Sequence, residues 1–446
     1  MRNSASASPS ASASASASAF ASASAFALAT AITVLATPAW ADERDPFAGA
    51  ARLERAALVE EVLARNPDVD AAEAAVDAAR ARARAAGAWM DPMLGYAVAP
   101  RSIAGDAPFG HRVELRQRIE YPGKRGAARA VADAAADVAA AARGSVRLEL
   151  AQLASDLYDA YYVVGRAQAI NEHHRALVAE MEESASAQYV VGRASAQDPL
   201  QARSKAAVLA REQVELAAER EQLAAELNGL LHRAPAAPLP PPPDTLVAAP
   251  APSGTTDELV ARALARHPER AVVGARIRGA RAEIAMARRE QYPDLELMAS
   301  YDSMSPMPEH RWMVGVMIEL PIVRGRRRAA IDAARAETRR MEREDDRLVD
   351  TLRVEIARAQ SQVAAAERLL ALDDQDVIPA AQARLEAARA GFIAAQNDFL
   401  VVIDADEALR DAELQRERTR AELSRRRAAL ARAVGLVPGL AQGEAP

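Results

Sequence analysis

The sequence of 446 residues contains no cysteine, and only 4% of its residues are aromatic. The absence of cysteine excludes disulfides, thiolate metal sites and a lipid-modified N-terminal cysteine. The net charge is −6 and the charged residues are interspersed, so the sequence has no basic block. This excludes a basic surface of the kind that binds nucleic acid. The apolar residues are dominated by alanine, which favours closely packed helices over a thick globular core.

Long hydrophobic runs are absent as well. The apolar run at residues 26–36 falls short of the ~20 residues that a membrane-spanning helix needs, and no later run reaches that length. The run follows an Ala/Ser-rich tract and precedes Ala39-Trp40-Ala41, an A-x-A cleavage pattern. We therefore expect residues 1–41 to be a signal peptide with a low-complexity tract. The mature chain is then exported, and any membrane anchorage comes from its fold.

The mature sequence is duplicated. Residues 63–67 (LARNP) recur at 264–268 (LARHP), an offset of 201, and residues 119–122 (IEYP) recur at 318–321 (IELP), an offset of 199. Nearly constant offsets indicate two copies of one structural repeat. The sequence therefore predicts the following segments: a first repeat at 42–232, a proline-rich linker at 233–256, a second repeat at 257–437 and a C-terminal tail at 438–446.

Apolar residues at helical spacing predict long helices in both repeats. From Val146 to Val164, and again from Leu348 to Leu370, apolar residues step by three, four or seven, a heptad-like pattern typical of coiled coils. These helices carry too many charges to cross lipid. We expect them to project into the periplasm as a helical tube.

Four further segments, near residues 92–100, 111–121, 293–302 and 311–320, alternate between apolar and polar side chains. This period of two predicts four strands in two hairpins, each about ten residues long, as a tilted strand needs to cross the hydrocarbon layer. Apolar-out, polar-in alternation is typical of outer-membrane barrels. We expect these residues to line the barrel lumen: Arg112, Glu114, Arg116, Arg118, Glu120, Glu296, Met298, Met313, Met317 and Glu319.

Four strands cannot close a barrel. An open edge in lipid leaves backbone N–H and C=O groups unpaired, at a cost of several kcal/mol each, so other copies of the chain must complete the barrel. Two copies give eight strands and an interior filled by side chains, whereas three give twelve strands and room for water. The charged lumen residues favour three copies.

The chain resembles the TolC-like outer-membrane efflux family over residues 42–435. The resemblance is carried by residues 121–126 (YPGKRG), 189–195 (YVVGRAS) with 198–200 (DPL), and 398–400 (DFL) leading to Asp404. It implies a mainly α fold with a small membrane β-barrel, built as a homotrimer with a 12-stranded β-barrel and a long periplasmic α-helical coiled-coil barrel. It also implies two partners, a periplasmic adaptor (membrane fusion protein) and an inner-membrane pump.

The same resemblance implies that two turns between long helices are periplasmic tips where the partners dock. The tip residues are Val191, Gly192, Arg193, Ala194, Ile393, Ala394, Ala395 and Gln396. Ala395 departs from the glycine usual at this position, and because glycine eases a left-handed turn, we expect a longer or reshaped second tip.

Asp404 is the leading gate candidate, because by the resemblance it faces the channel axis. Three carboxylates around a narrow axis repel each other and attract cations. Asp398, Asp198 and Arg193 are further gate candidates. For three of these residues a plain alternative stays open: Asp404 as a solvated helix residue, Asp198 as a helix cap, and Arg193 as surface decoration.

The sequence lacks the motifs of an enzyme: there is no G-x-S-x-G, Walker loop, H-E-x-x-H or cysteine nucleophile. His173 and His174 are adjacent, so on a helix they point apart, and we expect both to be solvated. We predict no catalytic residue, cofactor or dedicated metal site. The predicted function is a passive export duct for small solutes in a tripartite efflux system. The alternative is a periplasmic coiled-coil adaptor or structural protein of an envelope complex, against which the four strands argue.

Methionine is concentrated around the strands. Met298, Met313 and Met317 fall on the polar strand face, and Met304 and Met307 lie in the adjoining loop. Thioether sulfur suits soft ions such as Cu(I), and the resemblance leans toward heavy-metal efflux. Methionine is also an adaptable apolar filler, so both interpretations stay open.

Overall fold

The computed structural model describes residues 47, 49–99, 109–394 and 396–440. The predicted signal peptide, most of the loop between the first two strands, and Ala395 lie outside these ranges. The described residues belong to the unit that spans Arg44–Pro446. Within the described ranges, no helix combines the length and the hydropathy needed to cross a membrane.

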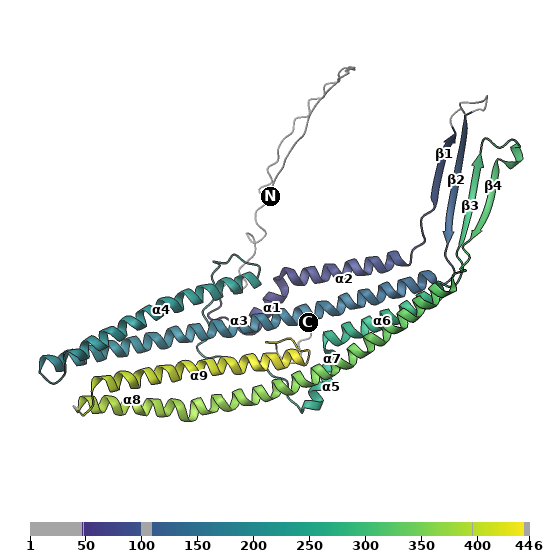
Figure 1. The fold of residues 1–446 in the computed structure, drawn as a ribbon. Coiled ribbons are helices and arrows are strands. Elements are labelled where there is room, and N and C mark those ends of the chain that lie inside the picture. The colour runs from purple at the N-terminus through teal and green to yellow at the C-terminus, as the bar shows by residue number, and fades with distance from the viewer. Residues whose placement is uncertain (1–46, 48, 100–108, 395, 441–446) are drawn as a thin grey trace, which may run out of the picture. The chain divides into compact units, whose positions relative to one another are not determined.

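The two halves of the chain have the same order of elements (Figure 1). The first half contains α1 (Arg55–Arg65), α2 (Pro67–Ala86), β1 (Met93–Ala99), β2 (Gly110–Ile119), α3 (Lys124–Val190) and α4 (Gln197–Leu230). The second contains α5 (Thr256–Arg266), α6 (Pro268–Arg289), β3 (Leu295–Asp302), the short 3₁₀ helix η1 (Pro308–His310), β4 (Trp312–Ile318), α7 (Arg324–Leu372), the π-helical segment η2 (Asp373–Val377), α8 (Ile378–Ile393) and α9 (Phe399–Ala433).

Matching caps start α2 and α6. The Asn66 side chain accepts a hydrogen bond from the Asp68 N–H at 2.9 Å, and His267 Nδ1 accepts one from the Glu269 N–H at 3.3 Å. In both cases proline is the first helical residue, where its missing N–H costs nothing. The repeated LAR-x-P sequence is therefore a repeated break between a short helix and a longer one.

A π-helical turn separates α7 from α8, whereas α3 runs without a break in the first half. Pro379 explains the difference, because it has no N–H to donate to the carbonyl four residues earlier and its ring clashes there. The wider turn of η2 relieves this clash. The strong helical periodicity of the sequence does not reveal such a turn.

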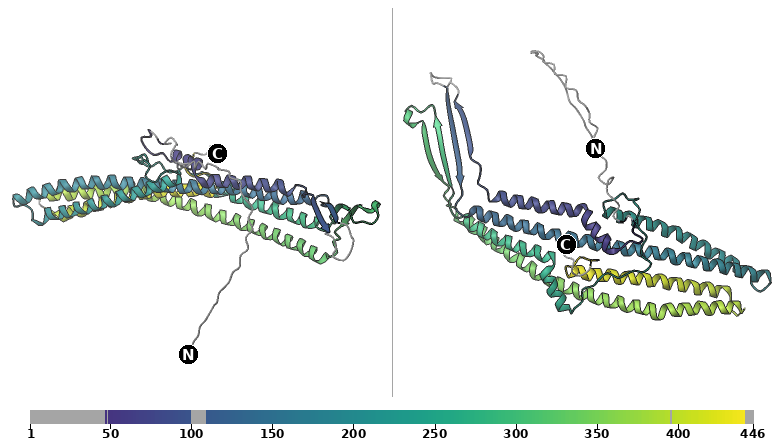
Figure 2. Two further views of the ribbon diagram at one scale, coloured as in Figure 1. Left: turned by 90° about the horizontal axis from the view of Figure 1, so that it is seen from above. Right: turned by 180° about the vertical axis from the view of Figure 1, so that it is seen from behind.

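The helices of the described part lie side by side (Figure 2). Helix α3 packs against α2, α4, α6 and α9, while α7 packs against α6 and α9. One core cluster joins α1, α3 and α4 through buried residues that include Leu58, Tyr161, Tyr162 and Leu227. A second cluster lies near the ends of α3 and α8 and includes Met181, Phe392 and Phe399.

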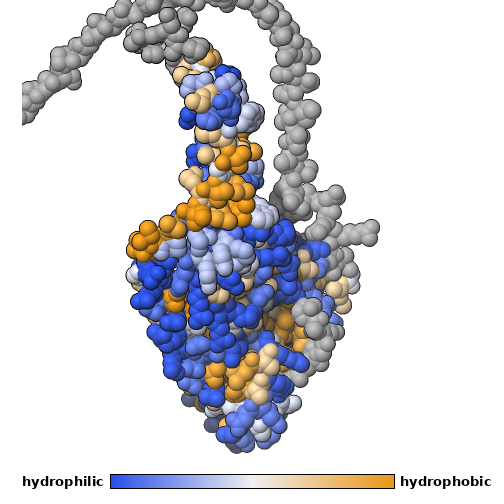
Figure 3. Space-filling model, turned by 90° about the vertical axis from the view of Figure 1, so that its right-hand side faces the viewer, coloured by the Kyte–Doolittle hydropathy of each residue, from blue (hydrophilic) through white to orange (hydrophobic). Residues whose placement is uncertain are grey.

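The four strands form one antiparallel sheet in the order β1-β2-β3-β4. Its centre pairs strands from different halves, with Arg116 opposite Met298 and Glu114 opposite Ser300. The sheet carries an exposed apolar face: Leu94 is 73% exposed, Trp312 72% and Val314 85%. Figure 3 shows hydrophobic residues gathered on the sheet above mainly hydrophilic helices.

Candidate functional site

The polar face of the sheet is the one that the alternation predicts. In the observed register, Glu114, Ser300 and Met313 lie opposite one another, as do Arg118, Glu296 and Met317. Paired residues share a face and successive residues alternate. The eight predicted lumen residues that lie inside the strands therefore share this face. Glu120 and Glu319 lie just beyond the strand ends, because β2 ends at Ile119 and β4 at Ile318.

Ion pairs cover much of this polar face. Arg112 contacts Asp302 at 2.6 Å, and Arg116 contacts Glu114 at 2.5 Å. Arg118 contacts Glu319 at 3.4 Å. These side chains stay partly exposed, which fits a wet surface rather than a closed core.

A buried carboxylate, Asp294, ties the sheet to the helices, and no pattern in the sequence predicted it. Its oxygens lie 2.8 Å from Lys124 Nζ and 2.8 Å from Arg118 Nη2, and one accepts a hydrogen bond from the Tyr121 N–H at 2.9 Å. Beside it the rings of Tyr121 and Tyr292 stack at 4.4 Å. Asp294 thus joins the start of β3 to the end of β2 and the start of α3.

The two predicted tips are the turns α3–α4 and α8–α9, which lie at the same end of the helices in Figure 1. In the first turn Gly192 has φ 72°, and the Arg193 N–H donates to the Gln188 carbonyl at 2.8 Å. This is the glycine-dependent helix ending of the Schellman type. In the second turn the Gln396 N–H donates in the same way to the Gly391 carbonyl, also at 2.8 Å.

The second tip was expected to be longer or reshaped, and the expectation of a longer turn is wrong. Residues 394–398 connect α8 to α9, whereas residues 191–196 connect α3 to α4. Because the bond from Gln396 closes the end of α8 just as that from Arg193 closes α3, the second connection needs no extra length. Ala395 lies outside the described residues.

A cavity of about 420 Å³ lies between the two tips and brings three of the four gate candidates together. Arg193 and Asp198 line it from the first turn, and Asp398 lines it from the second. Phe392 and Phe399 flank the second turn and also line the cavity, with their ring centroids 5.3 Å apart. They share a buried apolar cluster with Met181 and Ala185 of α3 and Ala202 of α4, so apolar packing fixes one tip against the other. Asp404 does not line this cavity.

Asp198 lies in the first turn of α4 and bonds back to the chain just ahead of the helix, whose N-cap residue Ala196 has no side-chain cap bond. One of its oxygens accepts a hydrogen bond from the Ser195 N–H at 3.3 Å, and the Ser195 hydroxyl accepts one from the Gln197 N–H at 3.2 Å. This reciprocal arrangement resembles a capping box. Asp398 precedes α9 without a side-chain cap bond and is exposed. Arg193 is exposed and forms no ion pair within the described residues.

Asp404 lies on the exposed side of α9, between the buried residues Ile403 and Ala405. Within the described ranges it has no hydrogen bond or ion pair. Its neighbours on α9 are bound inside the protomer: Glu407 contacts Lys205, and Arg410 contacts Glu212. Asp404 therefore differs from them in presenting a carboxylate that α4 does not neutralise.

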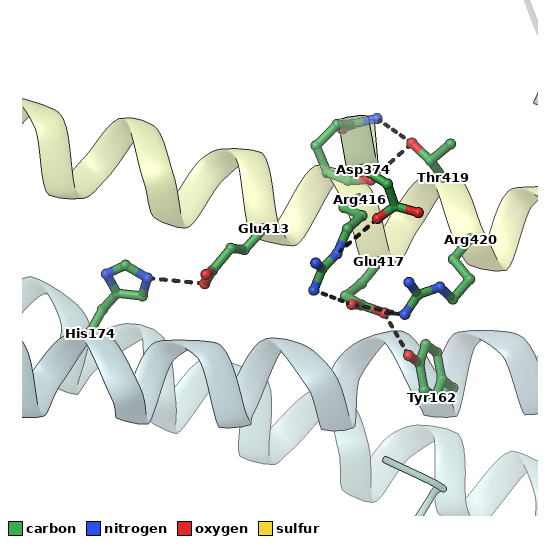
Figure 4. Close-up of polar contacts among 9 residues, drawn as sticks. Tyr162, His174, Asp374, Glu413, Arg416, Glu417, Thr419 and Arg420 are labelled. Carbon is green, nitrogen blue, oxygen red and sulfur yellow. Dashed lines mark hydrogen bonds and ion pairs between the residues drawn. The ribbon is translucent and has the colours of Figure 1, made fainter. Parts of the chain in front are cut away.

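The expectation that both adjacent histidines are solvated is wrong for His174, which is fully buried between α3 and α9. Its Nδ1 lies 2.9 Å from Asp406 Oδ1. Its Nε2 lies 3.2 Å from Glu413 Oε2, a contact drawn in Figure 4. Burial lowers the pKa of this imidazole, but the bonds to the two carboxylates outweigh burial and raise the pKa to about 9. His174 is thus a cation shared by two acids. His173 points outward, as expected.

A second buried polar cluster lies further along the same helices (Figure 4). Glu417 of α9 accepts a hydrogen bond from the Tyr162 hydroxyl of α3 at 2.5 Å and pairs with Arg416 and Arg420 at 3.0 and 3.1 Å. Arg416 also reaches Asp374 of η2 at 4.0 Å. This cluster links the π-helical turn to the centre of the bundle.

Comparison with known proteins identifies the class. The model of the family described as outer membrane efflux protein matches residues 58–231 and 259–436, one segment in each half. The chain therefore belongs to the outer membrane efflux protein family. It is an outer-membrane efflux channel protein with a large periplasmic helical portion, which confirms the family, fold class and location expected from the sequence.

Solved structures of outer-membrane channels share the fold. CusC superposes with a TM-score of 0.74 at 18% identity, covering 89% of this chain and 95% of its own. VceC from Vibrio cholerae gives 0.70 at 20% identity, with 85% and 95% covered. The open state of MtrE from Neisseria gonorrhoeae gives 0.67 at 17% identity, with 86% and 89% covered. Comparison with curated protein sequences finds no match.

Proposed function

We propose that this chain works as a homotrimer that forms a passive duct for small solutes in a tripartite efflux system. The observation that carries the proposal is the sheet, whose order leaves β1 and β4 as edges while its apolar face is exposed. Unpaired strand edges are not tolerated in lipid, so β1 of one copy must pair with β4 of the next. Three copies supply twelve strands, enough for a wet lumen lined by the charged face.

In this trimer Asp404 is the leading gate residue. It presents a carboxylate that the protomer leaves unpaired, and three copies around an axis would hold like charges close together. Arg193, Asp198 and Asp398, which line the cavity between the tips, form the surrounding part of the gate.

The tips are the proposed docking surface for an adaptor and its inner-membrane pump. Val190, Val191 and Ile393 are 82%, 66% and 76% exposed at the two tips, although they are large apolar side chains. Exposed apolar residues gathered in one place mark an interaction surface. In this proposal the inner-membrane pump supplies the energy for transport.

One strand offers a matched test of the lipid-facing assignment. Val314→Glu would place a charge on the apolar face of β4, while Met313→Glu would place it on the polar face one residue away. A lipid-facing Arg or Lys costs about 2–4 kcal/mol at the bilayer midplane, and a Glu costs less but is still unfavourable there, so we expect only Val314→Glu to lose outer-membrane trimer. The readout is detergent-extracted trimer from outer-membrane fractions.

Recovery of the wild-type mature protein as a detergent-free periplasmic monomer would reject the duct and favour the adaptor alternative. Equal trimer yields for the two variants would reject the assignment of the faces.

A further inference from the structure

Methionine is confined to one face of the sheet. Met93, Met298, Met313 and Met317, the methionines within the four strands, all lie on the face that carries Arg112 and Glu114. The opposite face of the described strands holds valine, leucine, isoleucine, alanine, glutamine, histidine, tyrosine and tryptophan, and no methionine. An apolar filler belongs on the apolar face, so packing alone does not explain this distribution.

Three of these side chains lie around a glycine on the polar face. Met298 of β3 lies opposite Gly315 of β4, and Met313 and Met317 lie two residues to either side of that glycine on the same face. A Cβ atom built on Gly315 would lie 3.2 Å from Met298 Cε. The thioether end of Met298 therefore lies over Gly315, between Met313 and Met317. Those two residues are roughly 13 Å apart along the strand, so a single ion is shared by Met298 and one of them rather than by all three. We call Met298, Met313 and Met317 the methionine row.

The row is accessible and carries its own counter-charge. Met313 and Met317 are each 47% exposed. Glu296 lies directly opposite Met317 and has an oxygen without a hydrogen-bond partner within the described residues. Arg116, opposite Met298, pairs with Glu114 at 2.5 Å and reaches the same Glu296 oxygen only at 3.8 Å. Arg118, opposite Glu296, pairs with Asp294 at 2.8 Å.

We propose that the methionine row binds a soft monovalent cation, Cu(I) or Ag(I), on the lumen wall. Thioethers select such ions, whereas hard divalent cations need oxygen ligands. Among the described residues, no group of three or more His, Cys, Asp and Glu side chains could hold a metal ion. The inference rests on the proposed function and deepens it, because it names soft metal ions as a cargo of the duct.

A fourth methionine extends the row toward the loop end of the sheet. Met304 fills the space over Gly110, where a Cβ would lie 2.0 Å from its Sδ atom. Gly110 shares the polar face with Arg112, two residues along β2. A soft ion leaving the row therefore meets another thioether in the outward direction.

The test is Ag(I) binding to the detergent-solubilised wild-type trimer, measured by calorimetry and by metal analysis after desalting. We expect saturable binding of about one Ag(I) per protomer, the capacity of a single thioether site. The combined Met298→Leu, Met313→Leu and Met317→Leu variant should weaken it more than about tenfold, since even outer partners of a metal change affinity by that factor. The control replaces Met181, Met286 and Met341, which lie in the helices, by leucine.

A second variant tests the geometry without removing sulfur. Gly315→Val places a branched side chain where Met298 lies, and should weaken Ag(I) binding while the trimer forms normally. Wild-type affinity in the triple leucine variant, or equal loss in the helix control, overturns the proposal. A conducting wild-type trimer that binds no Ag(I) overturns the methionine site alone, whereas a wild-type protein that forms no conducting trimer overturns the proposed function.

Discussion

His174 of α3 and Asp406 of α9 form a buried ion pair, with Nδ1 and Oδ1 2.9 Å apart, although 232 residues separate them in the sequence. The pair joins the first helical hairpin to the second, close to the tips. Glu413 contacts the other ring nitrogen, Nε2, so a carboxylate binds the imidazolium on each side. Three consequences of this and neighbouring contacts can be measured.

The His174 pair predicts that the protein loses stability at alkaline pH. The pKa of His174 is raised from 6.5 to about 9 in the folded protein, so its contribution is complete below pH 6.5 and is lost as pH rises through 9. The shift corresponds to a contribution on the order of 3 kcal/mol. Denaturation of the detergent-solubilised protein across this pH range checks it.

His174→Gln should flatten this pH dependence, because glutamine does not titrate. His173→Gln is the matched control, since His173 is the exposed neighbour on the same helix. If both variants keep the wild-type profile, another group controls the alkaline loss.

Tyr162→Phe should destabilise the bundle by about 1.5–3 kcal/mol, the usual value of a hydrogen bond to a charged group. The change removes the 2.5 Å bond from the Tyr162 hydroxyl to Glu417 and leaves that carboxylate buried. A shift in the thermal denaturation midpoint measures the loss. The neighbouring Tyr161→Phe removes only a 3.3 Å bond to the Pro240 carbonyl and should cost less, about 1 kcal/mol. An equal loss of stability in both variants would show that the hydrogen bond to Glu417 contributes no more than the bond to the Pro240 carbonyl.

Asp404→Ala should reduce the preference of the channel for cations and change its single-channel conductance. Removing three carboxylates from a narrow axis removes the local negative potential that attracts cations. Reversal potentials under a KCl gradient in planar bilayers measure the preference. Asp376→Ala, which removes an exposed carboxylate from η2, is the control. Unaltered selectivity in Asp404→Ala would mean that Asp404 is a solvated helix residue.

The sequence sufficed for features that depend on local periodicity. The alternation around Met313 and Val314 predicted which side chains share a face, because a strand has a strict period of two and the register preserves it. The LAR-x-P repeats predicted the duplication, and the structure shows a helix break at each of them. Strand ends were less well predicted, since Glu120 and Glu319 continue the alternation beyond the last ladder pairs.

Features that depend on residues far apart in the sequence could not be predicted from it. Nothing in the sequence near His174 predicts its contacts with Asp406 and Glu413. A histidine on a charged helix is expected to be solvated, and only the position of the neighbouring helix α9 shows that it is buried. Asp294 likewise follows a tyrosine-proline pair as many loop residues do, and its burial depends on Lys124 and Arg118. The π-helical turn at η2 had a visible cause in Pro379, but local periodicity does not distinguish a wider turn from a break.

The pairing of β2 with β3 also bears on how the protein reaches its membrane. Arg112 and Asp302, ion-paired across this seam, are 190 residues apart along the chain. Because contacts of such separation form late, neither hairpin gains a full set of backbone partners until nearly three quarters of the polypeptide has been exported. The apolar hairpins therefore lack part of their backbone pairing during secretion. A chaperone that shields their apolar faces until the chain is fully exported fits this order of events.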